Sequence, residues 1–169
     1  MNFTLFPAYE KSISLTPKGV IEIKTLPPMT VLQTKEAGSY FVEDNRMFRS
    51  LFRYISEKDI SMTTPVTVDV EPGAMRFIVS KKDLDRADEP TDNVAVVQLP
   101  ERTVVSIGYN GRYTKKNYEK HLGMLEEWLK DHASEWEVAG DPIAVYWDGP
   151  YKFPAWKKAE VMIPIKRDE

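Results

Sequence analysis

LPPMTVLQTKEAGSY (26–40) returns in altered form as LPERTVVSIGYNGRY (99–113). The alignment extends upstream without a gap, so that residues 21–40 lie over residues 94–113 at a constant separation of 73. The identical pairs are Leu26/Leu99, Pro27/Pro100, Thr30/Thr103, Val31/Val104, Gly38/Gly111 and Tyr40/Tyr113. Most other positions keep an apolar residue opposite an apolar residue. Self-similarity at a fixed separation predicts that the chain contains two structurally equivalent halves.

The first half contains the signals of strands around one helix. Residues 20–24 and 29–35 are β-rich, and Leu-Pro-Pro interrupts the chain between them. Residues 43–58 follow the apolar spacing of an amphipathic helix. Residues 65–70 and 75–79 are predicted strands on either side of the turn signal Glu-Pro-Gly-Ala. The apolar stripe of the predicted helix consists of Phe48, Leu51, Phe52 and Ile55.

The second half repeats this order of elements. Residues 94–98 and 102–109 are predicted strands, and residues 114–132 form the predicted second helix. Residues 142–147 and 159–165 close this half as two further strands. The apolar stripe of the second helix consists of Tyr118, Leu122, Leu125, Trp128 and Leu129.

This order predicts an α+β fold, in which duplicated βαββ units form one mostly antiparallel sheet with two helices packed on it. We expect a single domain with pseudo-symmetric halves at about 20–80 and 94–165, joined by the charged and solvated connector 81–93. Residues 1–19 are interpreted as an arm packed on the sheet. The helix residues expected to be buried against the sheet are Phe48, Phe52, Leu125 and Leu129.

The composition is that of an ordinary globular protein, with 42% hydrophobic and 29% charged residues. A net charge of −3 argues against nucleic acid as the main partner, because phosphate binding requires a basic surface. The absence of cysteine excludes a disulfide framework, a thiolate nucleophile and a cysteine-ligated metal. No signal-peptide pattern and no membrane-spanning stretch is found. We expect a soluble, cytoplasmic monomer or weak oligomer that binds neither nucleic acid nor membrane.

Residues 48–68, FRSLFRYISEKDISMTTPVTV, resemble the signature of the SOUL haem-binding family, in which a helix of the type FRxLFxYI runs into a strand of the type IxMTxPV. IEIKTLPP (21–28) looks like the opening strand of that family, and WKKAEVMIPI (156–165) looks like its closing strand. The resemblance implies two βαββ units in one curved sheet or distorted barrel with two helices. A wider relative is the gyrase-inhibitory-protein-like or effector-binding domain, which binds small organic molecules in a groove between the halves.

The resemblance implies a protein that carries or buffers haem or another tetrapyrrole and performs no reaction of its own. Some family members have a histidine in the first strand where this chain has Thr25, so any haem would lack that axial ligand. The alternative is an effector-binding module that senses or sequesters a small organic molecule such as a cation. A more remote interpretation is a minor hydrolase that uses Glu160 with Tyr109 or Tyr146.

The two histidines are candidate metal ligands, because haem often takes an axial imidazole. His121 and His132 both fall on or beside the apolar face of the predicted second helix. Eleven residues separate them, about 16 Å along an α-helix, so they cannot ligate one metal together. His121 remains an axial-ligand candidate, and a hydrogen-bonded packing role is the alternative. Common catalytic motifs are missing, so we expect a binding protein rather than an enzyme.

The remaining candidate residues fall into three groups. Arginines on one face of the first helix suit haem propionates, because guanidinium groups bind carboxylates bidentately; a solvated helix face is the alternative. Strand alternation turns Glu160 and Met162 away from the helices and toward a groove, unless they are simply exposed to solvent. Aromatic residues of the second half either wall a flat ligand or belong to the core. The ligand-binding candidates are Arg46, Arg49, Arg53, Met62, Tyr109, Tyr146, Trp147, Glu160 and Met162.

Overall fold

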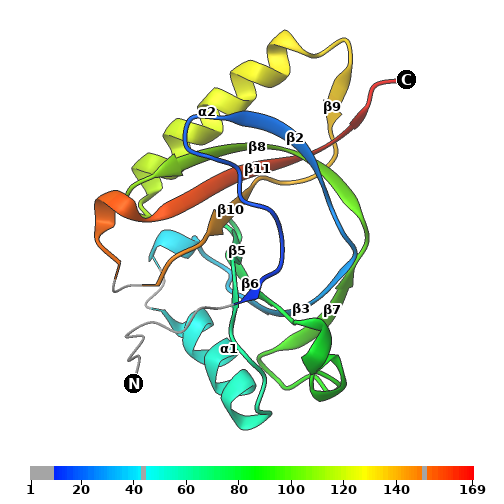
Figure 1. Ribbon diagram of the computed structural model, residues 1–169, viewed down its shortest axis with the longest axis vertical. Coiled ribbons are helices and arrows are strands. Elements are labelled where there is room, and N and C mark those ends of the chain that lie inside the picture. Colours follow the sequence, from blue (N-terminus) through cyan, green and yellow to red (C-terminus); the bar gives the residue numbers. More distant parts are fainter. Residues whose placement is uncertain (1–9, 43–44, 150–151) are drawn as a thin grey trace.

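The computed structural model describes residues 10–42, 45–149 and 152–169. Within these ranges the chain forms one strongly curled, mainly antiparallel sheet with two long helices on one of its faces (Figure 1). The predicted α+β fold of duplicated βαββ units is therefore confirmed. Residues 1–9, which belong to the predicted arm, lie outside the described residues.

The main sheet has nine strands, namely β2 (Ile21–Leu26), β3 (Met29–Lys35), β5 (Val66–Asp69), β6 (Ala74–Ile78), β7 (Ala95–Leu99), β8 (Arg102–Asn110), β9 (Trp136–Val138), β10 (Ile143–Tyr146) and β11 (Lys158–Arg167). Their order is β2-β8-β11-β10-β5-β6-β3-β7, and β9 pairs with β11. The first strand of each half crosses to the other half, because β2 pairs with β8 and β7 pairs with β3. A separate parallel ladder joins β1 (Glu10–Lys11) to β4 (Thr63–Thr64).

The strand register repeats at the same separation as the sequence. Leu26 pairs with Arg102 in the β2–β8 ladder, and Leu99 pairs with Met29 in the β7–β3 ladder. Each further pair of the β7–β3 ladder has its counterpart 73 residues away in the β2–β8 ladder. A slip of one residue would turn every side chain of a strand to the other face, so the shared register reflects the same inward and outward pattern in both halves.

We propose from this register that the chain is a single domain of two halves, about 20–80 and 94–165. The connector 81–93 is less solvated than its composition suggests. Part of it forms a 3-10 helix, and Asp83 is only 2% exposed. The Asp83 carboxylate accepts a hydrogen bond from the backbone N–H of Ser61 at 3.0 Å, which ties the connector to the first half.

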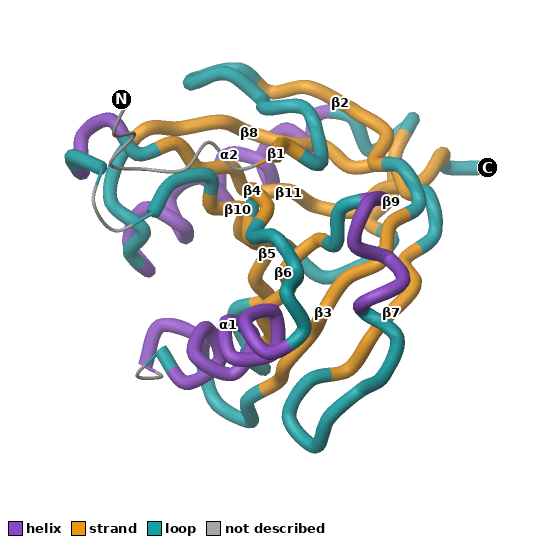
Figure 2. The backbone as a smooth tube through the Cα atoms, turned by 60° about the horizontal axis from the view of Figure 1, so that its bottom comes forward, coloured by secondary structure: helices purple, strands orange, loops and turns teal. Residues whose placement is uncertain are grey.

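Helices α1 (Arg46–Glu57) and α2 (Lys115–Asp131) lie on the same face of the sheet, which we call the outer face (Figure 2). α1 contacts β3 and β6, and α2 contacts β8 and β11. Thr114 caps α2, because its side-chain oxygen accepts a hydrogen bond from the backbone N–H of Asn117. In the part of the chain that the structure describes, no helix is long and apolar enough to cross a membrane.

The opposite face of the sheet, the inner face, is turned into the curl and is crossed by residues 12–18, which we call the strap (Figure 1). Ile13 and Leu15 of the strap pack in a second apolar cluster on this face. Gly108 makes the close approach possible, because a Cβ at this position would lie 2.2 Å from the carbonyl oxygen of Thr16. The strap therefore fits only because position 108 has no side chain.

The buried face of α1 is rotated by about one residue from the predicted stripe. Phe48 and Phe52 are 38% and 48% exposed, so the prediction that they are buried is wrong. The Tyr54 hydroxyl donates a hydrogen bond to the carbonyl of Glu89 at 2.6 Å and holds the other side of the helix against the core. Either set of residues satisfies helical spacing, so the pattern alone does not fix the rotation. The residues buried on α1 are Met47, Leu51, Tyr54 and Ile55.

Leu51→Ala is expected to lower the free energy of unfolding by about 2–5 kcal/mol, because Leu51 is fully buried and its truncation leaves a cavity. Phe52→Ala, although it removes a larger side chain, should cost about 1 kcal/mol or less, since nearly half of Phe52 is already exposed. Urea denaturation of both variants measures the difference. An equal or larger loss for Phe52→Ala would show that α1 presents its other side to the sheet.

Candidate functional site

A buried carboxylate lies at the centre of the inner face. Glu160 of β11 is 0% exposed. Its Oε1 accepts hydrogen bonds from Lys24 Nζ at 2.7 Å and from Ser106 Oγ at 2.8 Å. Its Oε2 accepts a hydrogen bond from Trp147 Nε1 at 2.6 Å. One ammonium group thus balances the charge, and both carboxylate oxygens are hydrogen-bonded, as a buried ion pair requires.

The strap adds two hydrogen bonds to the charged residues of β2. Lys24 Nζ also donates a hydrogen bond to the carbonyl of Ser14 at 2.7 Å, and its side chain is only 9% exposed. Thr16 Oγ1 donates a hydrogen bond to Glu22 Oε1 at 2.8 Å. An ammonium group of the protein itself therefore occupies the place that a cationic ligand of the buried carboxylate would need.

Several candidate residues share this inner face without lining an open groove. Glu160, Met162 and Trp147 are 0%, 1% and 8% exposed. They point away from the helices, as strand alternation predicts, but the strap covers them. Met62 lies elsewhere and packs, partly buried, against the core between helices and sheet.

Tyr109 and Tyr146 lie on the outer face and not beside the buried carboxylate. Both pair across their ladders with Ala159, the neighbour of Glu160 in β11. Because successive residues of a strand point to opposite faces, the sheet separates Glu160 from both tyrosines. The pairing of Glu160 with Tyr109 or Tyr146 on which a hydrolase was based is therefore not present.

A row of directly paired residues crosses the outer face between the two helices. It runs from Phe77 through Val66, Tyr146 and Ala159 to Tyr109. Neighbouring strands lie about 4.8 Å apart, so the row spans roughly 19 Å. α1 packs over the β6 end of this row and α2 over the β8 end. The row is thus the floor between the two helices.

Two tyrosine hydroxyls of this floor, on Tyr109 and Tyr146, are buried and have no hydrogen-bond partner among the described residues. Tyr113 stacks on Tyr146 at 4.1 Å between ring centroids, and His121 stacks on Tyr109 at 4.0 Å. Loss of solvation raises the pKa of all three tyrosines, and it raises the pKa of Tyr118 to about 12. All of these hydroxyls stay protonated at neutral pH; that of Tyr113 already donates to the carbonyl of Lys158, whereas those of Tyr109 and Tyr146 are donors without an acceptor among the described residues.

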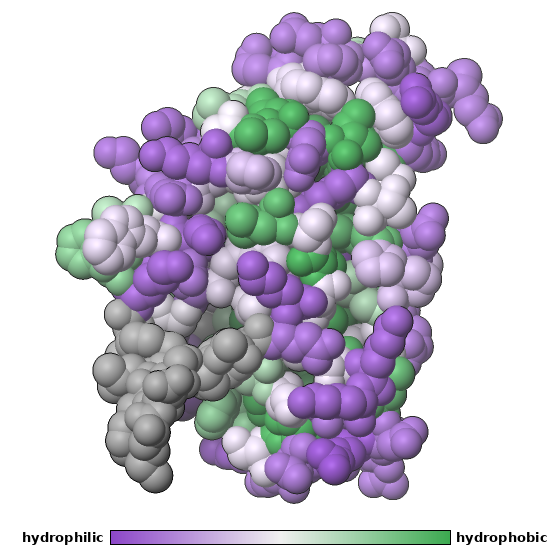
Figure 3. Space-filling model, in the orientation of Figure 1, coloured by the Kyte–Doolittle hydropathy of each residue, from purple (hydrophilic) through white to green (hydrophobic). Residues whose placement is uncertain are grey.

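Exposed aromatic side chains border this floor. The rings of Phe48 and Phe52 stack with 5.9 Å between their centroids. The ring of Phe48 also packs edge-on against that of Phe77, with 5.4 Å between centroids. Phe153 and Trp156, beside and within η3 (Pro154–Trp156), are 61% and 65% exposed. The segment around η3, orange at the left of Figure 1, projects from the same side of the molecule in Figure 3. The outer aromatic surface, as we name it, consists of Phe48, Phe52, Tyr113, Phe153 and Trp156, and the buried Tyr146 lies against the ring of Tyr113.

The structure brings the candidate arginines together on the exposed side of α1. Arg46, Arg49 and Arg53 line one surface hollow of about 380 Å³, and Lys35 of β3 lies in the same hollow. At roughly 100° per residue, Arg49 and Phe52 are about 60° apart around the helix. The cationic hollow and the exposed phenylalanines therefore border each other on α1.

Both histidines are held against their own helix. His121 Nδ1 lies 2.7 Å from the carbonyl oxygen of Asn117, and His132 Nδ1 lies 2.7 Å from that of Trp128. The ring of His121 stacks on Tyr109, and the ring of His132 stacks on Trp128. These are the contacts of packing histidines. Across the described ranges, no group of three or more His, Cys, Asp or Glu side chains is arranged to hold a metal ion.

The role of Lys24 was not found from the sequence, although a signal was present. In Ile21-Glu22-Ile23-Lys24 the apolar and charged residues alternate, which places Glu22 and Lys24 on the same face of β2. A charged face on a strand normally indicates exposure to water. The strap, which buries this face, has no comparable pattern in the sequence.

Glu160→Gln is expected to lower the free energy of unfolding by about 3–5 kcal/mol, because it leaves the Lys24 ammonium group buried without its counter-charge. The double variant Lys24→Met/Glu160→Gln should recover most of this loss. Glu137→Gln, which breaks the exposed Lys166–Glu137 pair, is the control and should cost less than about 1 kcal/mol. An unchanged denaturation midpoint for Glu160→Gln would show that water reaches the carboxylate beneath the strap.

Solved structures share this fold at low sequence identity. The EcmrR–DNA complex gives a TM-score of 0.70 at 15% identity over 88% of this chain, which spans 58% of that chain. A hydrolase from Listeria innocua gives 0.64 at 13% identity, over 89% of this chain and 94% of the other. SAV2435 bound to tetraphenylphosphonium gives 0.51 at 11% identity, over 87% and 94%. At these identities the likeness concerns the fold.

Comparison with curated protein sequences gives no match at a significant level. The family model described as SOUL heme-binding protein, in contrast, matches residues 7–164. The match includes both helices, both exchanged strands and the Met-Thr-Thr-Pro-Val segment that follows α1. The chain belongs to the SOUL heme-binding protein family.

Proposed function

We propose that the chain is a soluble, cytoplasmic carrier or buffer that binds haem or a related tetrapyrrole reversibly and performs no reaction of its own. Its membership of the SOUL family supports this class of ligand. The observation that carries the proposal is the outer aromatic surface, where Phe48 and Phe52 stay half exposed beside a floor of buried tyrosines. Clustered exposed apolar side chains of this kind mark interaction sites.

A flat, apolar ring fits this surface. Stacking on Phe48 and Phe52 would remove apolar area from water, and each well-placed aromatic contact adds about 0.5–1.5 kcal/mol beyond that area term. The hydroxyls of Tyr109 and Tyr146 lie in the floor and lack partners among the described residues. A polar group at the ring edge would relieve their desolvation, which costs about 1–3 kcal/mol for each buried hydroxyl.

The acidic side chains of a tetrapyrrole are proposed to lie toward the arginine hollow. Arg49 and Arg53 lie beside Phe52 on the exposed side of α1, and both line the same hollow as Lys35. Guanidinium groups take carboxylates in a bidentate arrangement, which fixes the orientation of the ring as well as adding affinity. These contacts are exposed to water, so their contribution should fall as the salt concentration rises.

We infer that binding does not depend on a histidine–iron bond. Thr25 stands where some family members have their histidine, and a threonine is not a haem ligand of the usual kind. His121 is engaged by the Asn117 carbonyl and by the Tyr109 ring. Apolar and ionic contacts alone give a moderate affinity, which suits a protein that has to release its ligand.

An organic cation is the second candidate, because a structural neighbour was solved with tetraphenylphosphonium. A site for a cation is usually built around a carboxylate that the ligand can reach. In this chain Glu160 already binds Lys24, and the strap covers both residues. Cation binding at Glu160 would therefore require the strap to leave the inner face, which ranks this function below tetrapyrrole binding.

Hemin titration, followed by the Soret band, tests the proposal. Phe52→Ala should weaken hemin binding about 3- to 10-fold through the lost stacking, and Arg53→Gln about 2- to 5-fold at low salt. Met124→Ala is the matched control, because Met124 is 45% exposed on α2. His121→Ala and His132→Ala should leave the Soret shift in place. Loss of that shift in either histidine variant, or an equal effect of Met124→Ala and Phe52→Ala, would contradict the proposed site.

A further inference from the structure

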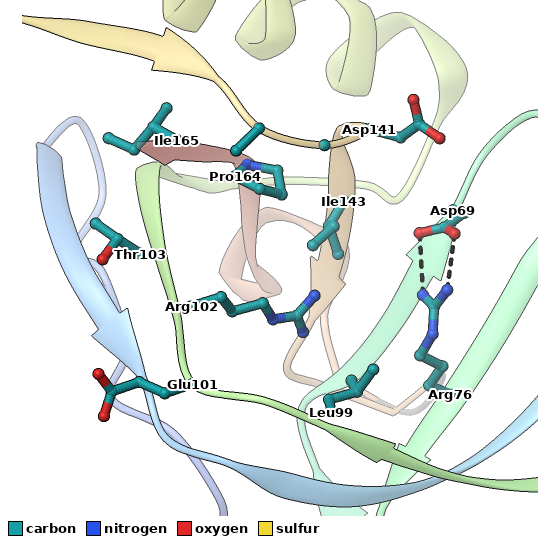
Figure 4. A pocket seen from close by; sticks show the side chains of 12 residues that line it. Asp69, Arg76, Leu99, Glu101, Arg102, Thr103, Asp141, Ile143, Pro164 and Ile165 are labelled. Carbon is teal, nitrogen blue, oxygen red and sulfur yellow. Dashed lines mark hydrogen bonds and ion pairs between the residues drawn. The ribbon is translucent and has the colours of Figure 1, made fainter. Parts of the chain in front are cut away.

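A cavity of about 500 Å³ opens on the inner face at the end of the curl that is formed by the β7–β8 turn (Figure 4). Arg102 of β8 extends into it from one wall, and Arg76 of β6 lines the opposite wall. Apolar side chains of Leu99, Ile143 and Pro164 complete the lining between them. The volume lies within the range of small-molecule sites in proteins, about 300–1,000 Å³.

The two arginines of this cavity differ in their partners. Each of the three side-chain nitrogens of Arg76 has a partner: the two terminal nitrogens donate to the Asp69 carboxylate at 2.9 and 2.7 Å, and Nε donates to Gln33 Oε1 at 2.7 Å. Arg102 has a buried Nε with no hydrogen-bond partner, and within the described residues its guanidinium group makes no ion pair. Both Asp69 oxygens are already taken by Arg76.

Arg102 is partly buried, and a guanidinium group that loses solvation without gaining a counter-charge is destabilised, because a buried charge is normally paired and hydrogen-bonded. The consequence is visible in the pKa of Arg102, which is lowered first by burial and then by the nearby charge of Arg76, with Asp69 acting in the opposite direction. Such a group is typical of a site whose counter-charge comes from a ligand.

The charges around Arg102 favour one negative group rather than several. Asp69 and Arg76 cancel each other as a bidentate pair, which leaves Arg102 as the uncompensated charge inside the cavity. Glu101 and Asp141 also line it, but both are exposed to water, and Figure 4 shows their carboxylates turned away from Arg102. These two rim charges would repel a ligand with several negative groups.

We propose that this cavity binds a small organic monocarboxylate, whose carboxylate pairs with Arg102 and whose compact apolar body lies against Leu99, Ile143 and Pro164. The planar guanidinium group of Arg102 matches a carboxylate with two parallel hydrogen bonds. The three apolar side chains exclude water from the rest of the ligand. Binding here would make a monocarboxylate a second ligand, separate from the tetrapyrrole.

The cavity lies on the inner face of the sheet, and the outer aromatic surface lies on the other face. Ile143 belongs to the inner cluster, whereas Tyr146 belongs to the core beneath the helices. Occupancy of one site therefore does not block the other by contact. This separation allows the monocarboxylate site to be tested whether or not the protein binds hemin.

Benzoate is a suitable probe, with benzamide as its neutral counterpart of the same shape. We expect benzoate to raise the melting temperature of the wild-type protein and to shift the methyl signals of Leu99 and Ile143 in NMR spectra. Arg102→Gln should weaken benzoate binding about tenfold or more, and Arg102→Lys should retain part of it, because lysine keeps the charge without the planar fork. Arg112→Gln, at an exposed arginine outside the cavity, is the control and should bind benzoate like the wild type.

Stability without ligand separates a binding role from a structural one. If Arg102 awaits a ligand, Arg102→Gln should melt at the same temperature as the wild type or higher, because it removes a partly buried charge that has no partner among the described residues. The proposal is overturned if benzamide acts like benzoate, if Arg102→Gln keeps wild-type benzoate affinity, or if benzoate moves neither methyl signal. If hemin displaces benzoate with one-to-one stoichiometry, the claim that the two ligands bind at separate sites is wrong.

Discussion

The ion pair between Glu160 and Lys24 closes the centre of the inner face of the sheet. A carboxylate that is 0% exposed is tolerable only when its charge is balanced and its oxygens are hydrogen-bonded, and Lys24, Ser106 and Trp147 supply these contacts. Lys24 in turn is held by the carbonyl of Ser14 in the strap. The strap, the ion pair and the apolar cluster below it thus cover the centre of the inner face, which is why we propose the outer face for a large flat ligand.

The exchange of first strands between the halves explains where that outer surface lies. β2 joins β8 and β7 joins β3, and the two halves also meet edge to edge at β10 and β5. Each half carries its helix over its own strands, so the junction between the halves becomes the floor between α1 and α2. Duplication therefore produces a floor that neither half would have alone. Aromatic residues of both halves, Phe48 and Tyr146 among them, gather around it.

The repeat in the sequence was sufficient to predict two equivalent βαββ halves, and the two exchanged ladders share one register as that equivalence requires, but the exchange itself was not predicted. The site was less predictable. Strand alternation correctly turned Glu160 away from the helices, but it carries no information about a covering segment such as the strap. For α1, two neighbouring stripes satisfy the helical period, and the partner that decides between them, the Glu89 carbonyl bound by Tyr54, is distant in sequence. In the sequence Arg102 is an ordinary charged residue after a turn. That its Nε is buried without a hydrogen-bond partner depends on residues distant in sequence and could not be predicted.

Hydrogen–deuterium exchange with and without hemin tests most directly whether the outer face is the ligand-binding face. The strap, residues 12–18, lies on the inner face, whereas α1 and η1 (Tyr40–Val42) belong to the outer face. The amide groups of the strap therefore report on the inner face, and those of α1 and η1 report on the outer face. We expect hemin to slow exchange in α1 and η1 and to leave the strap unchanged. Altered exchange in the strap with no change in α1 would contradict the assignment and place the ligand beside Glu160.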